Sequence, residues 1–197
     1  MKDLKNLFKH AVFLLAIAIA VAGCDNPINE DDTTDFYYNI LGEKVIFKIR
    51  KDKVAVLCKS LTDAAALYKN PVFISAICIG SVGQDYVIGT IDPEKTKLDY
   101  FLMMPEVVGA TYGLQYNNDT SLYYPCNHIC VKLKEGYSIK EALDKVGLTK
   151  SVIRINVSTT SYMINLDVKL GDILRISRML FESGSCEYAE PGFYYYF

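Results

Sequence analysis

Three residues of the segment 126–130 have side chains that could bind a metal. Cys126, His128 and Cys130 stand at every second position, so on an extended strand they point to one face. Thiolates and a neutral imidazole are good zinc ligands, but side chains two positions apart on a strand lie about 7 Å apart, too far for a tight tetrahedral site. No fourth ligand is evident. We therefore predict no metal and no other cofactor, and interpret the segment as the less apolar face of a strand; a metal sensor is the alternative.

The remaining cysteines do not define a disulfide framework. If Cys24 is modified as argued below, an odd number of thiols is left, so at least one is unpaired unless it pairs with another chain. Most of them fall in apolar strands, where cysteine behaves as a small hydrophobic residue. They are Cys58, Cys78, Cys126, Cys130 and Cys186.

Hydrolases and nucleotide-binding proteins need characteristic motifs, so the sequence can be searched for them. Once a signal peptide is removed, His128 is the only histidine, so any Ser-His-Asp triad would have to use it. The sequence has no Gly-x-Ser-x-Gly elbow, no P-loop and no G-x-G-x-x-G motif. We predict that the protein is not an enzyme.

The N-terminus has the pattern of a secretory signal. Three lysines precede an apolar run at 11–22, which ends in Val-Ala-Gly directly before Cys24. About a dozen apolar residues are too few to span a bilayer, which needs about twenty. The small residues before the cysteine resemble a bacterial lipobox, so we expect residues 1–23 to be removed and Cys24 to carry lipid.

Residues 24–35 form an acidic tether with almost nothing to bury. An acidic run at this place resembles a surface-export signal in some bacterial groups, whereas Asp25 beside the lipid resembles an inner-membrane retention mark in others. We expect a cell-envelope lipoprotein of the outer membrane, and the sequence does not choose its face. The processed chain has 18 basic and 22 acidic residues, which offers no basic surface for nucleic acid.

Along the last third of the chain, the spacing of hydrophobic residues switches between strand-like alternation and helical spacing. Alternation predicts strands and 3.6-residue spacing predicts helices in the order βαββαβ, which is that of the ferredoxin-like unit. Ser138 and Glu141 form a capping box, and Gly147 and Gly184 suit the ends of the two helices. The predicted elements are strand 128–134, helix 138–146, strands 152–157 and 161–166, helix 172–183 and strand 186–193.

Residues 36–116 repeat this order. After a leading hairpin at 36–47 we expect strand 53–59, a helix capped by Ser60 and Asp63, strands 73–79 and 86–91, a helix starting at Asp92-Pro93, and strand 107–116. Ser60 and Ser138 are 78 positions apart, and Ala110 and Ala189 are 79 apart. The near-equal offsets indicate an internal duplication; two ordinary units that share caps by chance are the alternative.

The predicted fold class is therefore α+β, with two tandem ferredoxin-like βαββαβ sandwiches. Each has an antiparallel sheet with two helices on one face. Behind the signal (1–23) and the tether (24–35), the first unit spans 36–116, a linker 117–126, and the second unit 127–197.

Two stretches of the second unit carry a family resemblance. Val-Lys-Leu-Lys-Glu-Gly-Tyr-Ser at 131–138 and the run at 180–193, which ends in Ala-Glu-Pro-Gly-Phe, resemble the prodomain of bacterial subtilisin-like serine proteases. The resemblance covers about seventy residues at the C-terminal end, and an order of elements alone is shared by unrelated functions.

The resemblance implies a binding role. In that family the segment after the last strand lies in the protease cleft as an added β-strand, and the helix-free face of the sheet packs on the enzyme. No protease domain follows Phe197 in this sequence, so the resemblance implies an inhibitor or folding partner that acts in trans. The tail that would enter the cleft is Glu190, Pro191, Gly192, Phe193, Tyr194, Tyr195, Tyr196 and Phe197. The exposed sheet face would carry His128, Cys130, Lys132, Arg154 and Asn156, because their neighbours must face the helices. These neighbours are Ile129, Val131, Leu133, Ile153, Ile155 and Val157.

Two alternatives stay open. The tail can equally be a last strand whose tyrosines cover the sheet or the junction between the units. The protein can also be a non-catalytic surface or periplasmic lipoprotein with a structural or interaction role, which has kept only the fold.

Overall fold

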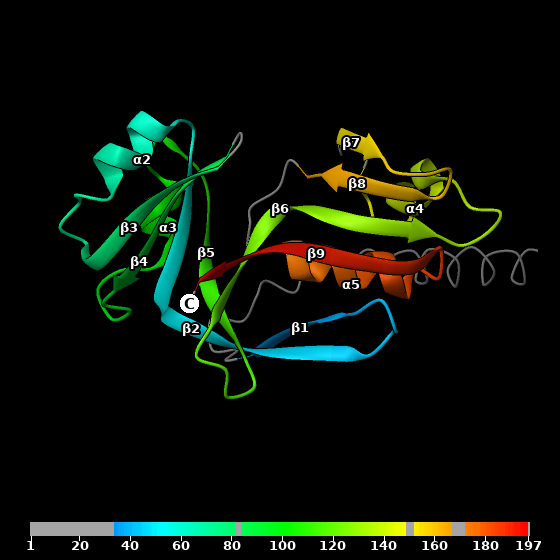
Figure 1. The fold of residues 1–197 in the computed structure, drawn as a ribbon, viewed down its shortest axis with the longest axis horizontal. Coiled ribbons are helices and arrows are strands. Elements are labelled where there is room, and N and C mark those ends of the chain that lie inside the picture. The colour runs from blue at the N-terminus through cyan, green and yellow to red at the C-terminus, as the bar shows by residue number, and fades with distance from the viewer. Residues whose placement is uncertain (1–33, 82–83, 149–151, 167–171, 197) are drawn as a thin grey trace, which may run out of the picture. The chain divides into compact units, whose positions relative to one another are not determined.

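The computed structural model describes residues 34–81, 84–148, 152–166 and 172–196, all within one compact unit that starts at Thr33. These residues form nine strands and four helices (Figure 1). The elements are β1 (Thr34–Tyr38), β2 (Lys44–Cys58), α2 (Leu61–Leu67), β3 (Phe73–Ser81), β4 (Gln84–Ile91), α3 (Leu98–Leu102), β5 (Val107–Tyr116), β6 (Leu122–Leu133), α4 (Ile139–Lys145), β7 (Val152–Asn156), β8 (Ser161–Asn165), α5 (Ile173–Glu182) and β9 (Cys186–Tyr196).

The N-terminal half, from β1 to β5, is built on four antiparallel strands in the order β3-β4-β2-β5. Helices α2 and α3 pack on one face of these strands. Their shared core contains Val54 and Val56 from β2, Ile91 from β4 and Phe101 from α3, each almost fully buried. Alternate residues of β2 thus face the helices, as a strand requires.

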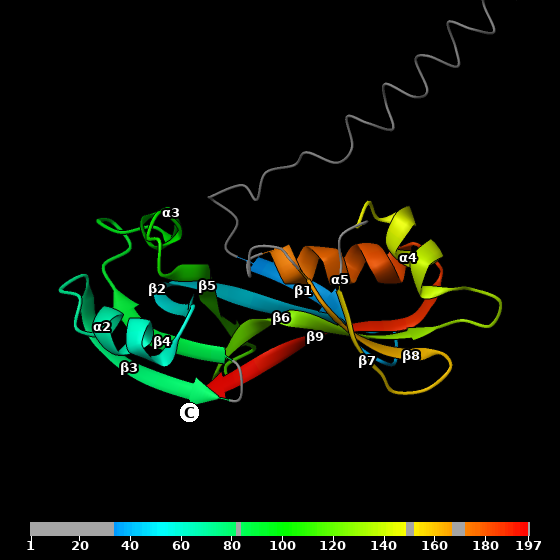
Figure 2. The same ribbon diagram turned by 90° about the horizontal axis from the view of Figure 1, so that it is seen from above.

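The C-terminal half, from β6 to β9, has the strand order β7-β8-β6-β9, again antiparallel. Helices α4 and α5 lie on the same side of these strands, behind them in Figure 1 and above them in Figure 2. The core under the helices includes Ile129, Val131, Ile164 and Leu180. Among the residues that the structure describes, no helix covers the other side of this sheet.

The two halves share one sheet. We predicted an α+β fold with antiparallel strands, which is confirmed, but the strands form a single nine-stranded sheet rather than two. The link is short: Leu114 pairs with Tyr123, and Gln115 pairs with Leu122. The turn between β5 and β6 is tight enough for the strands to continue the hydrogen-bond ladder, a pairing that local sequence patterns do not reveal.

Two segment boundaries differ from those predicted. The predicted linker 117–126 is reduced to a turn at 117–121, because β6 already begins at Leu122. The predicted tether 24–35 ends earlier, since β1 begins at Thr34 and pairs with β2 as the first strand of the leading hairpin.

The caps predicted at Ser138, Gly147 and Gly184 are present, and each depends only on residues close in sequence. The Ser138 hydroxyl accepts from the Glu141 amide, and the Glu141 carboxylate accepts from the Ser138 amide at 2.8 Å. Gly147 and Gly184 have φ of +73° and +74°, the left-handed conformation that ends a helix at low cost.

The predicted helix start at Asp92-Pro93 is wrong. The Asp92 carboxylate accepts from the Glu94 amide and pairs with Lys95, so residues 92–96 form a turn. Lys97 is extended, and α3 begins only at Leu98.

Candidate protein-binding face

The helix-free side of the strands β7, β8, β6 and β9 is the candidate site, and we call it the open face. Cross-strand pairing assigns its residues, because antiparallel partners share a face. The central row runs Ile155, Met163, Cys130, Glu190, and further rows carry Ser161 with Lys132 and Tyr188, and Asn165 with His128.

The open face combines apolar and charged groups. Ile155 is 50% exposed, and Met163, Cys130 and Tyr188 are half-buried. Lys132 forms an ion pair with Glu187 at 2.5 Å, which places a neutralised charge pair beside the apolar row. Exposed apolar groups with a polar surround are typical of protein-binding surfaces.

The residues predicted for this face are only partly found there. His128, Cys130 and Lys132 lie on it, but Asn156 pairs with Tyr162, whose row faces the helices. A register shift between Ile153 and Ile155 reverses the alternation and moves Ile155 onto the open face. The side chain of Arg154 lies outside the described part of the chain.

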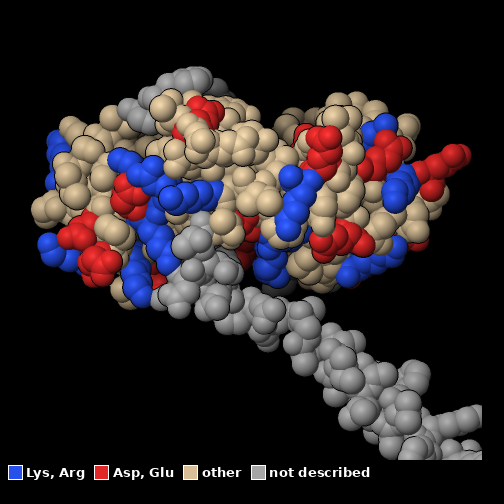
Figure 3. Space-filling view, turned by 90° about the horizontal axis from the view of Figure 1, so that it is seen from below, with Lys and Arg blue, Asp and Glu red and all other residues tan. Residues whose placement is uncertain are grey.

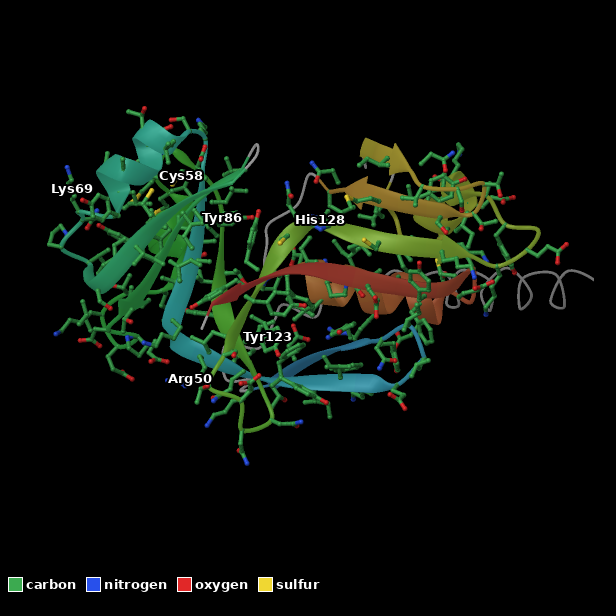
Figure 4. All side chains as sticks on the ribbon, viewed as in Figure 1. Arg50, Cys58, Lys69, Tyr86, Tyr123 and His128 are labelled. Atoms are coloured by element: carbon green, nitrogen blue, oxygen red, sulfur yellow. The ribbon has the colours of Figure 1, made fainter. Side chains whose placement is uncertain are left out.

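His128 lies against the backbone of β9 (Figure 4). A Cβ atom added at Gly192 would overlap the imidazole ring, with Nε2 as the nearest atom. Gly192 is therefore needed for the close approach of β9 to this side chain.

Burial raises the pKa of four of the five described cysteines. Burial raises the pKa of Cys126 to about 12, and burial together with Glu190 raises the pKa of Cys130. The five cysteines of the described residues are free thiols, and no group of three metal-binding side chains occurs among those residues.

The predicted tail is the end of strand β9. Tyr194 pairs with Tyr124, and Tyr196 pairs with Leu122, so the main chain of the tail hydrogen-bonds to β6. Pro191 is buried. The Glu190 carboxylate accepts from the Ile40 amide at 2.8 Å. A tail held in this way is not available as a loose strand for a protease cleft; Phe197 lies outside the described residues.

An aromatic cluster fixes Phe193 between the two halves. Its ring lies 5.7 Å from Tyr37, 5.5 Å from Phe47 and 6.0 Å from Tyr123, measured between ring centroids. Leu174 of α5 belongs to the same core. Burial, followed by the charge of Glu190, raises the pKa of Tyr37 to about 12.

Tyr194 covers the helix-free side of the N-terminal half. Its ring meets that of buried Tyr86 edge-on, at 4.6 Å between centroids, in a core with Leu57, Ile88 and Tyr124. In Figure 1 the end of β9 (red) reaches the strands of that half. The corresponding face of the N-terminal half is thus filled by the chain itself, whereas the open face of the C-terminal half is not.

Sequence reasoning missed Ile155, Met163 and the aromatic cluster. The bulge beside Arg154 has no distinctive residue, so an uninterrupted alternation assigned Ile155 to the core. The only sequence signal for the aromatic cluster is the large number of tyrosines, 15 in the chain.

The predicted lipidation site, Cys24, lies outside the described residues. Within the part of the chain that the structure describes, no helix is both long and apolar enough to cross a bilayer.

Comparisons with known proteins give no further assignment: no family model, no curated protein and no solved structure matches this chain.

Proposed function

We propose that this protein is a non-catalytic binding module, anchored to the cell envelope through lipid on Cys24, which binds a subtilisin-like protease as inhibitor or folding partner. The observation that carries the proposal is the open face, a four-stranded surface with helices on its other side only. Its central row presents the apolar side chains of Ile155 and Met163. The partner class comes from the sequence resemblance at 131–138 and 180–193.

The proposal includes two tandem ferredoxin-like units that arose by duplication. Both halves have the element order βαββαβ and equivalent strand orders. Equivalent positions also have equivalent environments. Ala110 and Ala189 are both buried, and added Cβ atoms at Gly113 and Gly192 would both meet a neighbouring side chain too closely.

The open face, rather than the tail, is the contact surface that we propose. Entry of residues 190–197 into a cleft would require β9 to separate from β6 and Phe193 to leave its cluster. The hydrogen bonds between β9 and β6 and the ring contacts of Phe193 would be lost, and their loss opposes this separation. The open face needs no rearrangement, which suits a rigid-body contact.

The pairing of β9 favours a second candidate function. A last strand whose tyrosines join the two halves is what we expect of a surface or periplasmic lipoprotein with a structural or interaction role. In that case the partner need not be a protease.

The test is to measure inhibition and refolding of a panel of subtilisin-like proteases, including any encoded nearby, with purified residues 25–197. This fragment contains the whole described unit. We expect slowed proteolysis or improved refolding for at least one enzyme. Tyr195→Ala should leave the effect unchanged, because Tyr195 is an exposed tail residue away from the open face. Absence of binding to every protease would leave the structural role as the function.

A further inference from the structure

A concentration of positive charge lies on strand β2. The ten residues 44–53 contain five basic side chains and one acidic side chain, in a chain whose net charge is −2. Alternation places Lys44, Lys48 and Arg50 opposite Phe47, which is buried in the core, so the three cations point away from it. We call Lys44, Lys48 and Arg50 the basic stripe.

The stripe is accessible and only partly neutralised. Lys44 and Lys48 are exposed, and Arg50 is half-buried. Arg50 pairs with Asp52 at 3.1 Å, so one of the three charges has a close counterion. In Figure 3, which views the molecule from below, Lys and Arg side chains lie over both halves, with Asp and Glu side chains between them.

The position of the stripe relates it to the anchor. Thr34, the first described residue, pairs with Lys48. Thr34 stands ten positions after Cys24, and an extended chain of that length reaches at most about 35 Å. The basic stripe therefore lies within one short tether of the proposed lipid.

We propose that the basic stripe binds the anionic phospholipid headgroups of the membrane that holds the lipid anchor. A basic patch beside a lipid anchor adds electrostatic attraction to anionic lipids. Each Lys or Arg at an anionic surface contributes about fivefold in binding. In Figure 1 the strand β2 that carries the stripe lies below the C-terminal half, whose open face is directed toward the viewer. Membrane contact through the stripe leaves the open face accessible to a protein partner.

The inference rests on the proposed anchor, so the assay uses unlipidated residues 25–197 and measures the stripe alone. The protein is sedimented with vesicles of phosphatidylcholine, or with vesicles in which about a third of the lipid is phosphatidylglycerol. We expect binding to the anionic vesicles only, and we expect it to be lost when salt is raised from about 0.1 M to about 0.5 M.

The decisive variant is Lys44→Gln with Lys48→Gln, which should weaken the partition coefficient about 30-fold. The control is Lys69→Gln with Lys134→Gln, which removes two exposed lysines from other elements and should leave binding near that of the wild type. Figure 4 shows Lys69 and Arg50 at different ends of the N-terminal half. An equal loss in both variants would overturn the proposal, as would equal binding to neutral and anionic vesicles.

The acidic tether is the competing occupant of the stripe. Vesicle binding that appears only after Glu30, Asp31 and Asp32 are replaced by amides would overturn the proposal, because the tether would then cover the stripe. Protease binding by the Lys44→Gln, Lys48→Gln variant serves as the folding control and tests the proposed function separately.

Discussion

Replacing Phe193 by Ala tests whether the end of the chain is a structural element or a free binding tail. The ring lies within 6.0 Å of Tyr37, Phe47 and Tyr123, measured between centroids, and belongs to a core shared by the two halves. Loss of the ring therefore removes contacts on both sides of the junction.

The expected cost follows from burial. A fully buried Phe→Ala substitution costs about 3–5 kcal/mol. Phe193 is half-buried, so about half of that remains, and the aromatic contacts add roughly 0.5–1 kcal/mol in total because they overlap with the burial term. We expect the free energy of unfolding to fall by about 2–3 kcal/mol, a large part of the roughly 5–15 kcal/mol of an ordinary domain.

The measurement is urea unfolding of residues 25–197, followed by tyrosine fluorescence and circular dichroism. At an m-value of about 2 kcal/mol/M the midpoint should fall by about 1–1.5 M. Tyr195→Ala is the matched control, since Tyr195 lies two positions along the same strand but is 61% exposed, and its loss should cost under about 1 kcal/mol. Equal small effects of both substitutions would refute the structural role of the strand.

Three further predictions concern single groups. Arg178→Met should lower the free energy of unfolding by about 2–3 kcal/mol, measured by thermal or urea unfolding. The reason is that Arg178 hydrogen-bonds to Asp35 in a contact that leaves each side chain about one-fifth exposed. A loss under about 0.5 kcal/mol would contradict this. Because the pKa of Tyr37 is raised from 10.0 to about 12 in the folded protein, its contribution to stability is complete below pH 10 and is lost as pH rises to about 12. Tyr37→Phe should reduce the alkaline loss of stability in unfolding curves, and an unchanged pH profile would argue against the burial. The buried Cys126 thiol should resist Ellman's reagent at mildly alkaline pH and react once guanidinium unfolds the chain, since burial raises its pKa to about 12; rapid reaction in the native state would contradict this.

Features fixed by neighbouring residues could be predicted from the sequence. The capping box of Ser138 and Glu141 needs only residues three positions apart. The left-handed ends at Gly147 and Gly184 depend on one residue each. The α+β class follows from hydrophobic periods that change along the chain, and the α+β class is confirmed.

Features that depend on contacts distant in sequence could not be predicted. The joining of β5 to β6 into one sheet depends on pairing across the turn at 117–121. The packing of β1 on α5 depends on Arg178, which contacts a carboxylate 143 positions away. Ile155 was assigned to the core because a bulge inverts the alternation without a residue that marks it.

The most direct test of the account is the affinity of an inactive subtilisin-like protease for the open-face variant Ile155→Glu. Ile155 is 50% exposed at the β7 end of the central row of the proposed contact, where a buried charge should weaken binding by at least about 30-fold. Met103→Glu, at a side chain 78% exposed beyond helix α3, should bind as the wild type does. Unchanged binding by Ile155→Glu, or an equal loss in both variants, would contradict the claim that the open face is the binding surface.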